Sequence, residues 1–270
     1  MIHPVKVDGA RAWRKTYDRG GRPVRLAALR AVVRGLDLPP LLPPPYRSGE
    51  AAKQTEKERI QELDALGVSV PRILDEGSDE LLLSDLGPTL SSQLREARGK
   101  PQRTDALVSS AVAAIGDAHR RGGYLSQAWP RNLTVHRGGI GFLDFEEDPR
   151  EVMSLADAQA RDWLLFAYGT MRYYRERPRA LEALLRGALH DAQDQTLSGM
   201  ADVATRLQPL ARGAARFGRS ARTFSQVLGV IRASLPVLVG ALVLLLGLDW
   251  IDDGEISLID DLVEDLVELF

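Results

Sequence analysis

The first part of the chain alternates short apolar runs with turns. The stretch VKVDGARAWRKTY holds two such runs around Asp8-Gly9, a strong signal for a β-hairpin. A helical pattern begins near Glu50 and stops at Gly67, and a strand, turn and strand pattern follows it as far as Gly87. Residues 1–87 therefore predict a small lobe that mixes strands with helix.

Beyond Gly87 the apolar positions recur at helical spacing over longer stretches. LSSQLREAR and ALVSSAVAAIGDAHRR each predict a helix, and residues 155–190 predict two more. Between these helices, residues 120–149 read as a loop followed by two short strands. Residues 88–200 are thus expected to form a mostly helical lobe, which gives the chain a two-lobed α+β fold.

The C-terminal part contains the longest uncharged run of the chain. Residues 227–248 carry no charge except Arg232, and a run of this length can span a bilayer as a helix. The basic linker 201–226 precedes it and the acidic amphipathic tail 251–270 follows it, in agreement with the positive-inside preference. We therefore expect residues 227–250 to associate with or span the inner membrane, with the globular body in the cytoplasm. A buried core helix is the alternative.

Composition narrows the classes of function. The sequence contains no cysteine, which excludes disulfides and thiolate chemistry, and its four histidines lack metal-ligand spacing. The net charge of -2 hides an asymmetry, because residues 249–270 hold nine acids and no Lys or Arg, leaving 35 basic and 28 acidic residues before them. No nucleic-acid recognition motif accompanies this basic body, so a nucleic-acid partner is not expected. MIHPVKVDGARAW lacks the apolar core of a secretory signal.

One stretch combines oxygen ligands at a recognisable spacing. RRGGYLSQAWPRNLTVHRGGIGFLDFEEDP places Asn132 on the predicted loop and Asp144 directly after the predicted strands. Amide and carboxylate oxygens are ligands that Mg²⁺ prefers, although Asp144 could also be an ordinary turn acid. Together with His119 and Gly122, these residues resemble the pattern H-x-x-G-x-x-H-G-D-x-x-x-x-N followed by D-F-E. That pattern belongs to the protein-kinase-like superfamily, and the resemblance is to its small bacterial branch of RIO-like and lipopolysaccharide-core sugar kinases.

This resemblance implies a bilobal fold that binds ATP and Mg²⁺ between its lobes. Asn132 and Asp144 would hold Mg²⁺, and Asp162 would brace the catalytic loop. Lys15 would bind the nucleotide phosphates. Its carboxylate partner would be Glu56, with Glu58 as a rival half a turn away. Asp85, in the segment LLLSDLG, would lie in the link between the lobes, where adenine binds.

The sequence departs from the family pattern at two places. Gln127 stands five residues before Asn132, where the family has its catalytic aspartate, and glutamine cannot accept a proton at neutral pH. Only Gly9 is available to replace the family's glycine-rich loop. Arg131 could supply positive charge near the transferred phosphate, and Glu147 or Asp148 could serve as an alternative base.

Three functions fit these observations. The first is a membrane-tethered phosphotransferase that uses ATP and Mg²⁺ to phosphorylate a hydroxyl on an envelope glycolipid or a protein. The second is a pseudokinase that works as a membrane scaffold or regulator, because Gln127 replaces the base. The third is an unrelated helical membrane-associated protein whose motif matches arise by chance.

Overall fold

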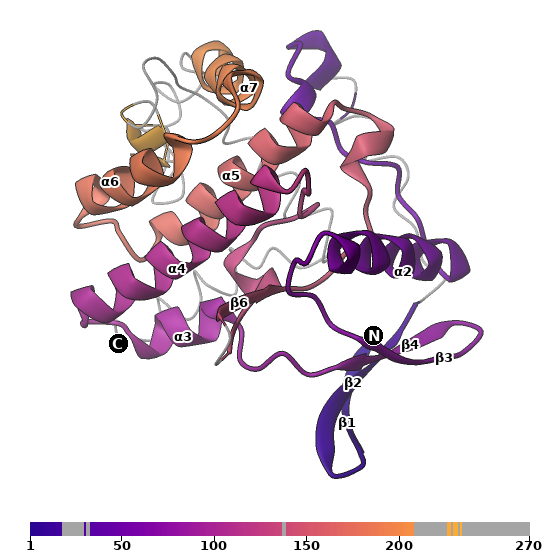
Figure 1. Ribbon diagram of the computed structural model, residues 1–270. Helices are drawn as coiled ribbons and strands as arrows, with labels where there is room; N and C mark the ends of the chain where they lie inside the picture. The colour runs from indigo at the N-terminus through magenta and orange to yellow at the C-terminus, as the bar shows by residue number, and fades with distance from the viewer. Residues whose placement is uncertain are drawn as a thin grey trace, which may run out of the picture.

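A four-stranded antiparallel sheet forms the N-terminal part of the protein (Figure 1). The computed structural model describes residues 1–17, 30, 33–136, 139–207, 226–227, 229–231 and 233. The strand order is β1-β2-β4-β3, with bounds β1 Ile2–Val7, β2 Ala10–Thr16, β3 Ile73–Glu76 and β4 Glu80–Ser84. Asp8 and Gly9 join β1 to β2 with φ of 50° and 79°, the backbone that a two-residue hairpin turn requires. The predicted hairpin is confirmed.

Helix α2, Glu50–Ala65, lies beside this sheet (Figure 1). Ala52, Glu56, Ile60 and Leu63 are buried, and their spacing of three to four residues puts them on one face of the helix. The chain leaves the helix through Gly67, whose φ of 71° is unfavourable for other residues. The sequence placed this end correctly. Because Glu56 belongs to the buried face, a carboxylate is held between helix and sheet.

The rest of the described chain is mostly helical. Its helices are α3 Leu90–Glu96, α4 Pro101–Arg120, α5 Leu155–Met171, α6 Pro178–Leu189 and α7 Asp194–Arg206, with short 3-10 helices η1 Pro39–Leu41, η2 Pro130–Asn132 and η3 Pro149–Glu151. Helix α5 is central: 14 of its 17 residues are buried. Ser154 and Asp157 form a capping box that fixes where it begins. The expected α+β class is confirmed in this form, a small antiparallel sheet followed by a mostly helical part.

A second, two-stranded sheet interrupts the helices. Strands β5 Leu133–His136 and β6 Gly139–Phe142 pair antiparallel, directly after η2. This is the loop and strand pair that the sequence predicted within residues 120–149. The backbone N–H of Phe142 donates to the carbonyl of Ser69, 2.9 Å away, which ties the hairpin to the chain segment between α2 and β3.

Most of the C-terminal predictions fall on residues outside the described ranges. This holds for the tail 251–270 and for nearly all of the expected membrane segment 227–250. Among the residues that are described, no helix is long and apolar enough to cross a membrane. Val227, Val230 and Ile231 are buried in the main core, and Gln226 donates to the carbonyl of Arg175. The described start of the apolar run therefore packs against the helical part of the protein. Helix α7 crosses the expected boundary between residues 200 and 201.

Candidate nucleotide and metal site

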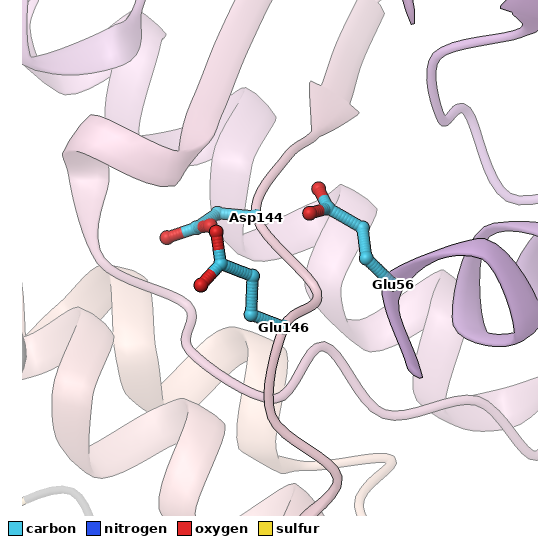
Figure 2. Close-up of side chains that lie close together, drawn as sticks. All are labelled: Glu56, Asp144 and Glu146. Atoms are coloured by element: carbon cyan, nitrogen blue, oxygen red, sulfur yellow. The ribbon is translucent and has the colours of Figure 1, made fainter. Parts of the chain in front are cut away.

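Three carboxylates surround the ammonium group of Lys15. Its Nζ lies 2.8 Å from Glu56 Oε2, 2.7 Å from Asp144 Oδ1 and 2.8 Å from Glu146 Oε1. Figure 2 shows the three acids converging, Glu56 from α2 and the other two from the chain that follows β6. Lys15 itself comes from β2. Three segments far apart in the sequence thus meet at one cation.

The cluster is electrostatically unbalanced and partly shielded from water. The side chains of Lys15 and Glu56 are 12% and 2% exposed, whereas those of Asp144 and Glu146 are 35% and 42% exposed. Burial disfavours the charged lysine, but Asp144, Glu56 and Glu146 outweigh it and raise the pKa of Lys15 well above its usual value. Burial alone would raise the pKa of Asp144, but the positive charges of Lys15 and Arg131 outweigh it, so the pKa of Asp144 is lowered. Lys15 therefore stays protonated and Asp144 ionised at neutral pH.

Glu56 is the acid that α2 presents to Lys15. Burial raises the pKa of Glu56, Lys15 opposes this, and the charges of Asp144 and Glu146 add to it. The hydroxyl of Tyr17 donates to Glu56 Oε2 at 2.6 Å, which fixes the carboxylate from a second side. Glu58 is exposed and accepts a hydrogen bond from Gln54 instead. Of the two acids that the sequence left open, Glu56 is the one in the cluster.

Alternation along β2 arranges several of these contacts. Trp13, Lys15 and Tyr17 are two residues apart, so in a strand their side chains point to the same face. Asp85 directly follows β4, and its Oδ1 accepts a hydrogen bond from Trp13 Nε1 at 2.6 Å. Asp85 also lines a pocket of about 620 Å³ together with residues 86–88, 135 and 136. One face of β2 thus connects the Asp85 segment with the Lys15 cluster.

The loop that carries Asn132 is joined to the segment that carries Asp144. The backbone N–H of Leu143 donates to the carbonyl of Asn132 at 2.8 Å. The buried Asn132 side chain donates through Nδ2 to the carbonyl of Gln127 at 3.2 Å. Asp144 has a φ of 68°, an unusual value for a residue other than glycine and one that often marks functional sites. Arg131 lies close enough to Asp144 to lower its pKa.

Gln127 contacts a further acid, Glu147, which is partly buried. Its side chain hydrogen-bonds Glu147, which also lies 3.6 Å from Nη2 of Arg161. Burial raises the pKa of Glu147; Arg161 opposes this shift, and the charge of Asp144 adds to it. The nearly inaccessible Arg161 also donates through Nε to the carbonyl of Ser126 at 3.3 Å. Gln127, which stands where the kinase-like pattern that the sequence resembles has its base, is therefore part of a Gln127–Glu147–Arg161 contact.

Asp162 of α5 supports the loop that carries Gln127. It is completely buried, and its Oδ2 accepts the backbone N–H of Leu125 at 2.7 Å and lies 3.1 Å from His119 Nε2. His119 in turn meets the ring of Trp163 edge-on, with centroids 5.5 Å apart. Helix α5 thereby fixes the backbone two residues before Gln127.

Sequence reasoning left Glu146 without a role and did not place Glu147. Alternation along a strand could not have found them, because Asp144 has a φ of 68° and the segment after it belongs to no strand. Asp144 and Glu146 both contact Lys15, whereas Glu147 between Glu146 and Asp148 contacts Gln127 and Arg161. The run DFEEDP thus contributes acids both to the Lys15 cluster and to the neighbouring contact with Gln127 and Arg161.

Comparison of the chain with models of known protein families and with curated proteins returns no match. The chemistry of the site therefore rests on its own residues. It offers a fixed lysine for anionic groups, oxygen donors in Asp144 and Asn132, and a pocket beside Asp85.

Proposed function

We propose that the chain is a protein-kinase-like phosphotransferase that binds ATP and Mg²⁺ between its sheet and its helical part. The observation that carries this proposal is the meeting of Lys15, Glu56 and Asp144, supplied by β2, α2 and the segment after β6. The family resemblance assigns these residues the same roles. Asp85 would lie beside the adenine, in the pocket that follows β4.

Each residue of the site has a chemical task in this proposal. Lys15, held by Glu56, would bind oxygens of the nucleotide phosphates as a fixed cation. Asn132 and Asp144 fit Mg²⁺ as hard oxygen donors, and the excess negative charge around Lys15 favours a divalent cation. When bound, Mg²⁺ would neutralise charge that develops on the phosphates during transfer. Arg131 would add positive charge on the loop side.

The transfer step needs an oriented acceptor hydroxyl. Its oxygen would form a bond to the γ-phosphorus while the bond from that phosphorus to the β–γ bridging oxygen breaks, and ADP leaves with the electron pair. Gln127 can hold the hydroxyl but cannot take its proton. Glu147, hydrogen-bonded to Gln127 and raised in pKa by its burial, would receive that proton directly or through water.

The acceptor class follows from the sequence rather than from the site. We propose a hydroxyl on an envelope glycolipid or on a protein near the inner membrane, because residues 227–250 have the length and apolarity of a membrane segment. That segment lies almost entirely outside the described residues, so this part of the proposal depends on hydropathy and resemblance.

A pseudokinase is the second candidate, favoured by one specific observation. The side chain of Gln127 hydrogen-bonds Glu147, its backbone carbonyl accepts from Asn132, and the turn between β1 and β2 contains only Asp8 and Gly9. Such a protein would bind nucleotide and regulate a partner without transferring phosphate.

ADP formation by the full chain separates the two candidates. The phosphotransferase predicts Mg²⁺-dependent ADP formation that rises when an acceptor extract is added and is lost in Asp144→Asn. Arg14→Gln, on the opposite face of β2, is the matched control and should retain the activity. Nucleotide binding without any ADP formation would reject transfer and support the pseudokinase.

A further inference from the structure

Two consecutive residues of α5 hold the backbone directly before Gln127. Oδ2 of Asp162 accepts the N–H of Leu125 at 2.7 Å. Nε of Arg161 donates to the carbonyl of Ser126 at 3.3 Å. The side chains of Arg161 and Asp162 are 3% and 0% exposed. The helix thus holds one donor and one acceptor of the loop from two adjacent positions.

The loop has an uncommon backbone at the residue whose carbonyl Arg161 contacts. Ser126 has a φ of 65° and is buried. The N–H of Gln127 donates to the carbonyl of Leu125 at 2.7 Å, which closes a three-residue turn. A left-handed backbone is unfavourable for serine and persists only where the surroundings hold it. The hydrogen bond from Arg161 is one such restraint.

The same guanidinium reaches the acid beside Gln127. Nη2 of Arg161 lies 3.6 Å from Oε2 of Glu147, and the side chain of Gln127 hydrogen-bonds Glu147. Glu147 belongs to the segment after β6, whereas Gln127 precedes β5. A rigid fork of donors can hold a carbonyl and a carboxylate at two fixed places, which a single ammonium group cannot do. Arg161 therefore joins two segments that are separate in the chain.

Stability alone does not account for a charged residue at position 161. Among the residues that the structure describes, Nη1 of Arg161 is buried without a hydrogen-bond partner. The contacts with Ser126 and Glu147 are long for a guanidinium. A buried charge with incomplete partners costs free energy, and an apolar side chain of similar volume often packs as stably or better. Such a residue is expected where the placement of its partners serves function.

We propose that Arg161 is a positioning residue for the transfer reaction, because it holds the Ser126–Gln127 backbone and the Glu147 carboxylate in one fixed arrangement. The inference rests on the proposed function, in which Gln127 holds the acceptor hydroxyl and Glu147 receives its proton. Arg161 acts through these two neighbours and not by contact with the nucleotide.

Steady-state ADP formation by the full chain from ATP and Mg²⁺, with water as the acceptor, tests this role. Arg161→Met removes both contacts of the guanidinium. We expect kcat to fall at least about tenfold while the KM for ATP stays within about twofold, because the lost interactions act in transfer and not in nucleotide binding. Arg179→Met, on the exposed surface of α6, is the matched control and should keep both values.

A double variant separates positioning from a general effect on the fold. If Arg161 acts through Glu147, Arg161→Met/Glu147→Gln should form ADP as fast as Glu147→Gln alone, within about twofold. Independent losses would multiply instead. Urea unfolding checks that Arg161→Met folds. Arg161→Lys replaces it if it does not, because one ammonium group cannot hold both partners.

Hydrogen exchange at the backbone amide of Gln127 reports the loop without any need for activity. Its hydrogen bond to the carbonyl of Leu125 depends on the turn at Ser126. Exchange in Arg161→Met should be at least about tenfold faster than in the wild type and should be unchanged in Arg179→Met.

The outcomes distinguish this inference from the proposed function. ADP formation by the wild type that is equal in Arg161→Met overturns the positioning role and leaves the proposed function standing. Multiplied losses in the double variant, or unchanged exchange at Gln127 in Arg161→Met, overturn the positioning role as well. A folded wild type that forms no ADP rejects the proposed function, and the positioning role falls with it.

Discussion

Nζ of Lys15 lies 2.7 Å from Oδ1 of Asp144, although 129 positions separate the two residues in the chain. This contact joins β2 to the segment that follows β6, and Glu56 of α2 shares the same ammonium group. In the proposed function, this cation, held among more carboxylates than it can neutralise, would exchange these partners for nucleotide phosphates and Mg²⁺.

Removing the cation should destabilise the fold. Lys15→Met leaves the inaccessible carboxylate of Glu56 facing Asp144 without a counter-charge, and breaking a buried ion pair in this way costs about 3 kcal/mol. The free energy of unfolding in urea measures this loss. Lys15→Met/Glu56→Gln should recover part of it, because the uncompensated charge is then gone. A Lys15→Met variant as stable as the wild type would show that the ion pairs contribute nothing.

Asp162 should contribute to stability through the loop. Asp162→Ala leaves the buried N–H of Leu125 without its acceptor and opens a gap beside His119, which predicts a loss of about 2 kcal/mol. The exposed Asp64 of α2 provides the control, since Asp64→Ala removes no side-chain contact of this kind. Urea unfolding of the two variants gives the comparison, and equal midpoints would contradict the bracing role.

Introducing an aspartate at Gln127 should lower the stability of the fold in a pH-dependent way. The new carboxylate would face Glu147, whose pKa is already raised by burial, so the two acids would resist being ionised together. When folding raises the pKa of a carboxyl group, the fold keeps its full stability at pH values below the pKa of that group in the unfolded chain. The fold then loses stability as the pH rises through the higher pKa of the folded state. Gln127→Asp should thus match the wild type near about pH 4 and be less stable by about 1–2 kcal/mol at about pH 7.

The control for this prediction is Gln127→Asp/Glu147→Gln, in which one acid is removed. Its unfolding free energy should approach that of the wild type at neutral pH. A Gln127→Asp variant whose stability relative to the wild type does not change with pH would show that Gln127 and Glu147 are not coupled.

The ion pair of Asp105 and Arg177 should stabilise the fold at neutral pH and lose this effect as the pH falls, which is opposite to the pH dependence expected for Gln127→Asp. Hydrogen bonds from Arg177 lower the pKa of Asp105, although burial opposes the shift. A lowered pKa contributes stability that is present above the ordinary value and lost as pH falls through the folded one. Both side chains are about one third exposed, so Asp105→Asn should cost only about 0.5 kcal/mol at about pH 6. That difference should disappear in unfolding experiments below about pH 3; a constant difference would exclude the charge effect.

Local patterns were sufficient for much of the fold. The Asp8-Gly9 turn fixes the first hairpin, and Gly67 ends α2 where the helical pattern stops. Both depend on a few adjacent residues and on backbone conformations that glycine favours. The same local signals cannot tell how α5 packs, because its 14 buried residues are distributed around the whole helix rather than along one stripe.

The site was predictable only in outline. Spacing and resemblance selected Lys15 and Asp144, which the structure brings together. Spacing could not choose between Glu56 and Glu58, a choice made by burial and by the hydroxyl of Tyr17. The contact of Gln127 with Glu147 depends on tertiary packing.

Calorimetric titration of ATP into the full chain, with and without magnesium, tests the central claim most directly. The account predicts binding that requires magnesium, is lost in both Lys15→Ala and Asp144→Asn, and persists in the control Arg14→Gln. Circular dichroism confirms that each variant is folded before it is titrated. Absence of ATP binding by the folded wild type, or binding that survives both Lys15→Ala and Asp144→Asn, would contradict the nucleotide site.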